Sequence, residues 1–375
     1  MIYHETPSGT LHQGEVLEIL RTLPDESVNC CVTSPPYWGL RDYGTAEWEG
    51  GDQECDHKQH FARNDGGRVN TNGFHGSATE GSNKGAINYR DQCPKCGAIR
   101  KDRQLGLERT PEEYVARMVE IFREVRRVLR KDGTLWLNLG DSYLSDGTKE
   151  MSVKDGSGIQ ASQRAKNDDY RETTPTRNAR YYKNTNLKRK DLVGIPWRVA
   201  FALQADGWYL RQDIIWHKPN PMPESVTDRC TKAHEYVFLM SKSAKYYYDN
   251  DAIRQKPTGR TDPITSFGKT IKRGESYSLD AQKGANKRSV WSIATKPFKE
   301  AHFATFPRDL IRPMIQAGCP AGGVVLDPFM GSGTTAIEAI YQGKRYIGID
   351  LNSDYCAMAA KRIDAELEQT VIDFP

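Results

Sequence analysis

Apolar residues are grouped into short segments of two kinds, which predict alternating helices and strands. From Val115 to Leu129 the apolar side chains recur at helical spacing. Thr110 and Pro111 before them supply a capping hydroxyl and a first-turn proline, and Glu113 follows three residues after the cap. We expect residues 131–133 to end this helix, and the apolar run that follows predicts a buried strand.

The same alternation fills the rest of the chain outside three polar segments. A helix is expected at 196–207, strands at 208–218 and 235–243, and an N-terminal strand, helix and strand ending with the apolar run 28–33. The C-terminal part predicts a helix at 306–318, a strand at 323–329, a helix at 334–343, a strand at 345–350 and a helix at 354–369. Helices alternating with strands indicate an α/β fold with a mostly parallel sheet and helices on both faces.

Length and composition allow one large α/β domain with insertions, or two domains. The chain has 375 residues, 37% of them apolar, and a formal net charge of +4. No apolar run approaches the roughly 20 residues that cross a bilayer, so no membrane partner is expected. The first ten residues do not resemble a signal peptide, and eight unevenly spaced cysteines suggest a reducing, cytoplasmic location. Cys30 and Cys31 lie inside an apolar run and are expected to be buried.

A glycine-rich turn follows the expected strand 323–329 in the stretch VVLDPFMGSGTT. Gly331 and Gly333 let the backbone approach a ligand closely, and Thr334 and Thr335 begin a helix whose free N–H groups face the same place. Asp350 ends the next strand, where an acidic residue suits ribose hydroxyls. The spacing is not that of a dinucleotide or phosphate loop, and Asp327 better suits an ammonium or sulfonium group than a phosphate.

A second unusual stretch, VTSPPYW, ends the strand at 28–33. Two adjacent prolines have fixed φ angles and no N–H groups, which makes the turn rigid. The Pro35 carbonyl and the Ser34 hydroxyl can each accept one hydrogen of an aromatic amine, freeing its lone pair. Tyr37 can stack on a base that has been rotated out of a duplex. A tight turn at the end of a strand is the plainer interpretation of either stretch taken alone.

Together, DPFMGSGTT and TSPPYW resemble the motifs of the DNA amino-methyltransferases, which transfer a methyl group from S-adenosylmethionine to an exocyclic base nitrogen. The catalytic motif precedes the cofactor motif, which resembles the β class, a circular permutation of the Rossmann-like class I methyltransferase fold. The resemblance implies that Ser34, Pro35, Pro36 and Tyr37 are catalytic. It also implies that Gln13-Gly14-Glu15 lies near the cofactor adenine and that the segment from His302 flanks its methionine end. The cofactor-binding residues it implies are Glu15, Phe306, Asp327, Pro328, Phe329, Gly331, Gly333, Thr334, Thr335 and Asp350.

Cys55, His57, Cys93 and Cys96 have the C-x-H and C-x-x-C spacing of a tetrahedral zinc site. His60 is an alternative to His57, and four unrelated surface side chains are the plainer interpretation. Methyl transfer needs no Lewis acid, so we expect a structural Zn²⁺ that orders an insertion lacking an apolar core.

The two motifs and the polar segments define an expected domain organisation. The basic and aromatic stretch 164–190 and the segment 253–290 are candidates for DNA contact, although solvated loops would look the same. Trp38, Trp216 and His217 are candidates for the base pocket, or for core positions. The expected parts are the catalytic start 1–49, a zinc-binding insertion 50–104, catalytic segments 105–144 and 191–252, a basic insertion 145–190, a target-recognition region 253–295 and a cofactor-binding segment 296–375.

The resemblance favours site-specific methylation of cytosine N4, because a serine before the two prolines is usual in N4 enzymes. N6-adenine methylation by the same mechanism is the alternative. A protein or RNA amino-methyltransferase and a non-catalytic DNA-binding relative are further alternatives, disfavoured by the motif order and by the intact motifs respectively. The expected partner is double-stranded DNA. The resemblance leaves open whether the chain also pairs with a second copy of itself and whether it acts beside a restriction nuclease of the same restriction-modification system.

Overall fold

The computed structural model describes residues 1–39, 45–60, 86–88, 92–144, 186–255, 265–266, 269–270, 284–296 and 306–373. Residues 145–185 of the expected basic insertion, His302 and much of the expected target-recognition region lie outside them. The chain divides into two compact units. The first comprises Met1–Arg41, Leu105–Lys296 and Thr305–Pro375, and the second comprises Asp42–Gln104 with Pro297–Ala304.

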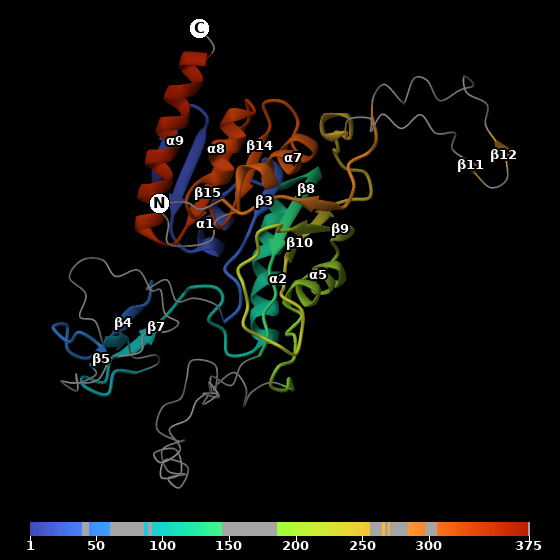
Figure 1. Ribbon diagram of the computed structural model, residues 1–375. Coiled ribbons are helices and arrows are strands. Elements are labelled where there is room, and N and C mark those ends of the chain that lie inside the picture. The colour runs from blue at the N-terminus through green and yellow to red at the C-terminus, as the bar shows by residue number, and fades with distance from the viewer. Residues whose placement is uncertain are drawn as a thin grey trace. The chain divides into compact units, whose positions relative to one another are not determined.

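A nine-stranded sheet forms the middle of the first unit (Figure 1). Only β1 and β10 run antiparallel to their neighbours, so the predicted mostly parallel sheet is confirmed. The spatial order is β1 (Ile2–Thr6), β2 (Gly9–Gln13), β15 (Arg345–Asp350), β14 (Val324–Asp327), β3 (Val28–Thr33), β8 (Leu129–Leu139), β10 (His234–Ser241), β9 (Tyr209–His217) and β13 (Val290–Ser292).

Helices cover both faces of this sheet, as predicted (Figure 1). Alternate strand side chains enter two separate apolar clusters: Cys31 joins one and Cys30 the other. Both thiols are fully buried, and burial raises the pKa of each. The first cluster packs under α1 (Val16–Thr22), α2 (Pro111–Val128) and α5 (Ile195–Ala205), and the second under α7 (Arg308–Gly318), α8 (Thr334–Tyr341) and α9 (Ser353–Asp373).

The structure differs from the sequence prediction at the end of α2 and at the N-terminus. Helix α2 ends at Val128 and not at 131–133, because Leu129 is already extended and pairs with Val28 of β3. Leu129 is buried as a strand residue at a position that also continues the helical repeat, so periodicity could not place the boundary. The N-terminal β1–β2 hairpin was not predicted, because only its buried Leu11 gives an apolar signal.

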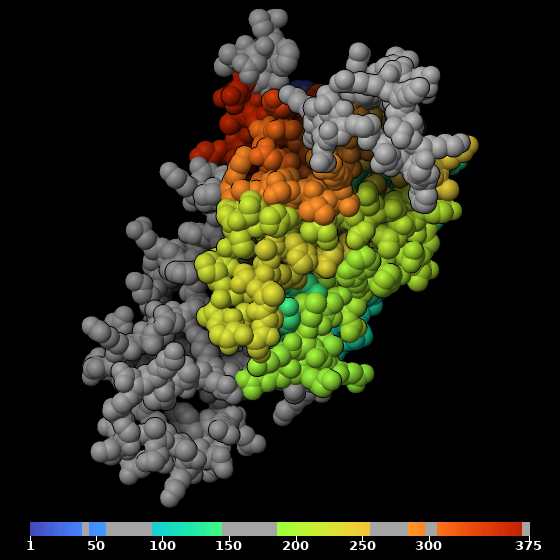
Figure 2. Space-filling model, turned by 45° about the vertical axis from the view of Figure 1, so that its right-hand side comes forward, coloured from blue at the N-terminus to red at the C-terminus, as the bar shows by residue number. Residues whose placement is uncertain are grey.

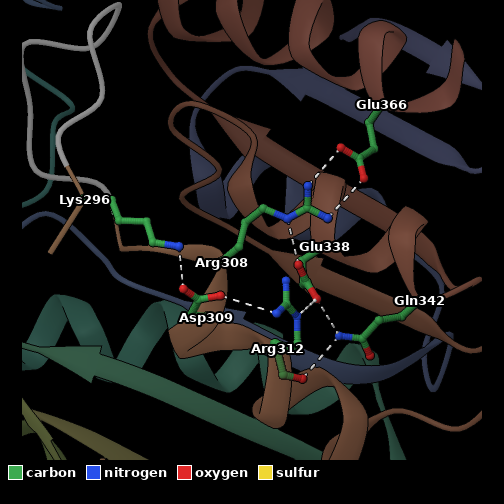
Figure 3. A network of polar contacts seen from close by, with 7 residues as sticks. All are labelled: Lys296, Arg308, Asp309, Arg312, Glu338, Gln342 and Glu366. Atoms are coloured by element: carbon green, nitrogen blue, oxygen red, sulfur yellow. Dashed lines mark hydrogen bonds and ion pairs between the residues drawn. The ribbon is translucent and has the colours of Figure 1, made fainter. Parts of the chain in front are cut away.

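Helices α7, α8 and α9 are joined by a polar network (Figure 3). The fully buried Glu338 of α8 accepts hydrogen bonds from Arg308 at 2.8 Å and from Arg312 at 3.0 Å, both on α7. Arg308 also makes a bidentate pair with Glu366 of α9, at 2.9 and 3.0 Å. Since α8 begins at the glycine-rich turn, this network fixes the helix that carries the turn.

The remaining short elements are small hairpins and a turn of helix. In the second unit β4 (Glu47–Glu49) pairs with β7 (Ile99–Lys101), and β5 (Lys58–His60) with β6 (Ala86–Asn88). In the first unit β11 (Thr265–Ser266) pairs with β12 (Lys269–Thr270), and η2 (Asp251–Ile253) is a 3-10 turn. Within the described ranges, no helix is both long and apolar enough to cross a membrane.

Candidate active site

The predicted motifs meet at one edge of the sheet, where the parallel strands β2, β15, β14, β3 and β8 have their carboxyl ends. This edge is where α/β sheets bind ligands. Strand β3 leads into Ser34, β14 into the glycine-rich turn, and β15 ends at Asp350. Strand β10 runs the other way, so its first residues, including Glu235, reach the same edge. Figure 2 shows a face on which green to yellow residues of 186–255 border orange residues from the later part of the chain.

Asp327 is fully buried and both of its carboxylate oxygens are hydrogen-bonded. One accepts from the Thr33 hydroxyl at 2.7 Å and the Phe329 N–H at 3.0 Å, and the other from the Thr335 hydroxyl at 2.6 Å. Burial raises the pKa of Asp327 to about 6 despite these three donors. The carboxylate therefore connects the end of β3 to the glycine-rich turn and α8, in addition to supplying negative charge beneath the turn.

Asp350 holds the other side of the turn. Its carboxylate accepts the Gly331 N–H at 2.8 Å and the Asn352 N–H at 2.9 Å. Burial raises the pKa of Asp350 to about 6, and the nearby charge of Asp327 contributes to the increase. Two interacting carboxylates thus lie under one short backbone turn.

The turn itself depends on glycine at two positions. Gly331 and Gly333 have φ angles of 52° and 84°, in the left-handed region that favours glycine. A Cβ at Gly333 would lie 3.0 Å from the Ala359 Cβ of α9, whereas at Gly331 the nearest atom would be 3.9 Å away. Gly333 is therefore required for packing as well, and Gly331 leaves open space above the turn.

The other residues expected to bind the cofactor lie close to these elements in the chain. Thr334 and Thr335 are buried in the first turn of α8, where the prediction placed them. Pro328 and Phe329 follow Asp327 directly, and Phe329 and Phe306 are each partly buried. Glu15 caps α1 through the Glu18 N–H at 2.9 Å and pairs with Arg117 at 3.2 Å, so it positions a helix end as well as lying after β2.

The Ser34–Tyr37 turn is held rigidly from several sides. The Tyr114 hydroxyl donates to the Pro36 carbonyl at 3.0 Å, which ties the turn to α2. A Cβ at Gly140 would lie 2.5 Å from the Tyr37 ring, so only glycine fits against the ring there. These contacts hold the Tyr37 ring and the Pro36 carbonyl, which directly follows the Pro35 carbonyl that the sequence analysis singled out.

Glu235 connects this turn to β8 and β9, and the sequence analysis did not identify it. Its carboxylate accepts the Tyr37 hydroxyl at 2.8 Å and the Asn138 amide at 3.0 Å, and pairs with Lys218. The Lys218 ammonium also lies 4.4 Å from the centre of the Trp216 ring. The available signal was a set of polar residues at strand ends, namely Asn138 near the end of β8, Lys218 directly after β9 and Glu235 at the start of β10, but no spacing linked them to Tyr37.

A cavity of about 230 Å³ adjoins the Tyr37 ring, entirely within the first unit. It is smaller than pockets for drug-sized ligands, which measure about 300–1,000 Å³, and suits a single planar ring system. Trp38 lines it, whereas Trp216 and His217 do not. Gly140, Asp141, Lys218 and Glu235 also line the cavity.

The second unit brings Cys55, His57, Cys93 and Cys96 together, with all four potential ligand atoms within 4.8 Å of one another. The Cys55 and Cys93 sulfurs are 3.7 Å apart, and the Cys96 sulfur is 3.5 Å from His57 Nδ1. A tetrahedral zinc ion bound at about 2.3 Å to sulfur and 2.0–2.1 Å to nitrogen requires separations of about 3.8 and 3.5 Å. The Cys55–Cys93 and Cys96–His57 distances therefore match tetrahedral coordination, and the remaining pairs of ligand atoms lie within 4.8 Å.

Local contacts hold this cluster in place. The Gly97 N–H donates to the Cys93 carbonyl at 2.8 Å, and the φ of 77° at Gly97 closes the turn between the two cysteines. The His57 ring stacks on Trp48, with ring centres 4.4 Å apart. A side chain at Gly51 would come within 2.8 Å of the Cys96 sulfur. The side chain of His60, the alternative ligand, lies outside the part of the chain that the structure describes.

Comparison with known proteins agrees with this geometry. The family model described as DNA methylase, N6_N4_Mtase, matches residues 28–361. The chain is 39% identical to the Type II methyltransferase M.Cfr9I of Citrobacter freundii, over 96% of this chain and 90% of that protein. It is 40% identical to the Type II methyltransferase M.XycI of Xanthomonas campestris pv. cyanopsidis, over 95% and 88%.

Two solved structures share the fold at low sequence identity. The PvuII DNA methyltransferase (cytosine-N4-specific) has a TM-score of 0.53 and 16% identity, covering 97% of this chain and 93% of that one. The DNA modification methylase TTHA0409 of Thermus thermophilus, complexed with S-adenosyl-L-methionine, has a TM-score of 0.50 and 19% identity, covering 95% and 93%. The chain therefore belongs to the DNA methylase family, as a β-class DNA amino-methyltransferase of the Type II group.

Proposed function

We propose that this enzyme methylates the N4 amino group of cytosine within a specific DNA sequence. The observation that carries the proposal is Ser34, which stands at the end of β3 before two prolines, where N4 enzymes usually have serine. Its hydroxyl lies at the sheet edge that also carries the glycine-rich turn and the cavity. The cytosine-N4 specificity in the name of the PvuII enzyme agrees with the choice, although that likeness concerns the fold alone.

The residues at the edge of the sheet fit the cofactor. S-adenosylmethionine supplies a methyl group on a positively charged sulfur. The ionised carboxylates of Asp327 and Asp350 place negative charge beneath the turn, and Asp350 stands where ribose hydroxyls are bound in such folds. The open space above Gly331 allows the backbone to approach the ligand, and Phe306 and Phe329 offer partly buried aromatic surface.

The catalytic turn supplies acceptors for the target amine. An exocyclic amine of a base is a poor nucleophile because its lone pair is delocalised into the ring. The Ser34 hydroxyl and the Pro35 carbonyl each accept one N–H, which localises the lone pair on nitrogen for attack on the methyl carbon. The base stacks on Tyr37 in the adjoining cavity after rotating out of the duplex. Catalysis then rests on positioning and on fixed dipoles.

Adenine N6 is the second candidate, because both amines need the same two acceptors. The experiment that separates the two is mass spectrometry of nucleosides from the DNA of a methylation-deficient host expressing the protein. We expect N4-methylcytosine with the wild type and none with Ser34→Ala, whose binding of S-adenosylmethionine should be nearly unchanged. N6-methyladenine alone would replace the cytosine assignment, and full methylation by Ser34→Ala would remove the role of Ser34.

We further propose that the cluster of Cys55, His57, Cys93 and Cys96 binds one structural Zn²⁺. The support is the gathering of the four ligand atoms within 4.8 Å, two pairs of them at tetrahedral separations, and the scarcity of apolar core residues among the described residues of the second unit. Four protein ligands complete the coordination shell, so the ion has no open position for substrate. Its role is to order the insertion.

Elemental analysis of protein purified without chelator tests the zinc proposal. One zinc per chain is expected, and Cys93→Ser with Cys96→Ser should lose it and make residues 50–104 sensitive to proteolysis. Cys230→Ser is the matched control, because Cys230 is an exposed cysteine outside the cluster. Absence of stoichiometric zinc in the wild type, or zinc retained by the double variant, would contradict the proposal.

The remaining functional assignments stay proposals. Residues 253–295 are proposed to read the target sequence, because the β class usually has its target-recognition region at this place in the chain. Residues 145–190 are proposed to contact DNA phosphates, because they are rich in basic residues. A cytoplasmic location and a partner restriction nuclease agree with the Type II relatives. A homodimer also stays a proposal.

A further inference from the structure

Ser34, Tyr37 and Glu235 form a chain of hydrogen bonds that runs from the catalytic turn to β10. The Ser34 hydroxyl donates to the Tyr37 hydroxyl at 3.4 Å, and the Tyr37 hydroxyl donates to Glu235 at 2.8 Å. Glu235 is 198 residues from Tyr37 in sequence, so the contact is made only by the fold.

The direction of this chain follows from the groups in it. An ionised carboxylate can only accept hydrogen bonds, and a tyrosine hydroxyl has one hydrogen. Glu235 therefore takes the Tyr37 hydrogen, and the Tyr37 oxygen is left to accept from Ser34. The Ser34 hydrogen then points toward Tyr37, and the remaining lone pairs of the Ser34 oxygen are free to accept from another donor.

Two partners besides Tyr37 hold the Glu235 carboxylate in place. Lys218 pairs with one carboxylate oxygen, and the Asn138 amide donates to the other at 3.0 Å. Only 16% of the Glu235 side chain is exposed, so solvent screens the ion pair with Lys218 only in part. Charge on Glu235 also raises the pKa of Tyr37 beyond the effect of burial, which keeps the Tyr37 hydroxyl protonated and able to donate.

We infer that Glu235 is a positioning residue that orients the Ser34 hydroxyl as a hydrogen-bond acceptor for the target amine. The inference rests on the proposed role of Ser34. Without the carboxylate, Tyr37 can donate to Ser34, and the serine hydrogen then points at the amine, where it opposes binding of the donor N–H. Glu235 thus acts on the amine through Tyr37 and Ser34.

A double-mutant cycle of Glu235→Gln and Tyr37→Phe tests the inference. Each change breaks the same chain, and each should lower kcat roughly tenfold, the effect of one misdirected hydrogen bond. The kcat of the double variant should also fall roughly tenfold and not a hundredfold, because the first change has already broken the chain of hydrogen bonds. The dissociation constant of S-adenosylmethionine should stay within twofold of the wild type in all three.

Asp206→Asn is the matched control for the loss of a paired carboxylate. The Asp206 side chain is 13% exposed, pairs with Arg123 and caps α5 at the end away from the cavity, about 16 Å along the helix from Ile195. Its kcat should equal that of the wild type. Combined with Tyr37→Phe, it should give the kcat of Tyr37→Phe alone.

Two outcomes would overturn the inference while leaving the proposed function intact. One is a double variant whose kcat falls by the product of the two factors measured for the single variants. The other is a Tyr37→Phe enzyme with wild-type kcat while Ser34→Ala is inactive. Tyr37→Phe keeps the ring and does not disturb Lys218, so it decides the question even where Glu235→Gln is too unstable to assay. Full methylation by Ser34→Ala would instead remove the proposed role of Ser34, on which the inference rests.

Discussion

Lowering the pH from 7.5 to 5 should weaken the binding of S-adenosylmethionine, because two carboxylates beneath the glycine-rich turn titrate in this range. Burial raises the pKa of Asp327 and the pKa of Asp350 to about 6. The cofactor is positively charged at its sulfur, so it favours the ionised form of both groups. Protonation of either one removes negative charge from the site.

The size of the effect follows from the two pKa values. With a pKa of about 6, each group is almost fully ionised at pH 7.5 and roughly one-eleventh ionised at pH 5. If binding depends on the ionised form of one of the two carboxylates, lowering the pH from 7.5 to 5 raises the dissociation constant roughly tenfold. If binding depends on the ionised form of both, the dissociation constant rises roughly a hundredfold. Because the two groups interact, the titration gives apparent values for the pair.

Loss of binding at low pH would not result from unfolding caused by these two groups. Their folded-state pKa values lie above those of an unfolded chain, so the native state binds more protons between about pH 4 and 6. The free energy of unfolding contributed by these groups therefore rises as the pH falls through this window. At neutral pH the charges on Asp327, which is fully buried, and on Asp350, which is partly buried, reduce stability.

Calorimetric titration with S-adenosylmethionine at half-unit steps from pH 5 to 7.5 measures the effect. Asp350→Asn should bind more weakly at pH 7.5 and show a shallower dependence on pH, because one titrating group is gone. Asp206→Asn should follow the wild-type curve. A dissociation constant that stays within twofold between pH 5 and 7.5 in the wild type would refute the reasoning.

Two further substitutions test the packing around the site. Gly140→Ala places a methyl group 2.5 Å from the Tyr37 ring, so it should lower kcat at least tenfold while calorimetry shows unchanged cofactor binding; a wild-type kcat would show that the ring is not held there. Glu338→Ala leaves Arg308 and Arg312 without their shared buried partner, and urea denaturation should show a free energy of unfolding lower by about 2–3 kcal/mol. This is less than the roughly 3–5 kcal/mol lost from fully buried pairs, because both arginines are partly exposed. Glu338→Gln should lose less, and a change under about 0.5 kcal/mol in Glu338→Ala would contradict the account of Figure 3.

The parts of the site that the sequence predicted depend on short stretches of chain. The Ser34–Tyr37 turn and the turn around Gly331 each stand between one strand and the next element, so the local pattern identifies them. The α/β alternation then brings both to the same edge of a parallel sheet. The short spacings within Cys55–His57 and within Cys93–Cys96 likewise predicted that these four side chains come together.

The sequence did not reveal contacts between distant segments. Asp327 was interpreted mainly as an anionic partner for the ligand, but it also bonds Thr33, which lies 294 residues earlier. Glu235 reaches Tyr37 because β10 runs antiparallel in an otherwise mostly parallel sheet. Neither contact has a periodic or motif signal, since each depends on the order of strands in the sheet.

Sequencing of DNA from cells that express the protein, with detection that separates N4-methylcytosine from N6-methyladenine, tests the central claim most directly. The account predicts N4-methylcytosine at one position of a single recurring sequence, and no modification when Ser34→Ala is expressed at the same level. Modified adenine, or modification that persists in Ser34→Ala, would contradict it.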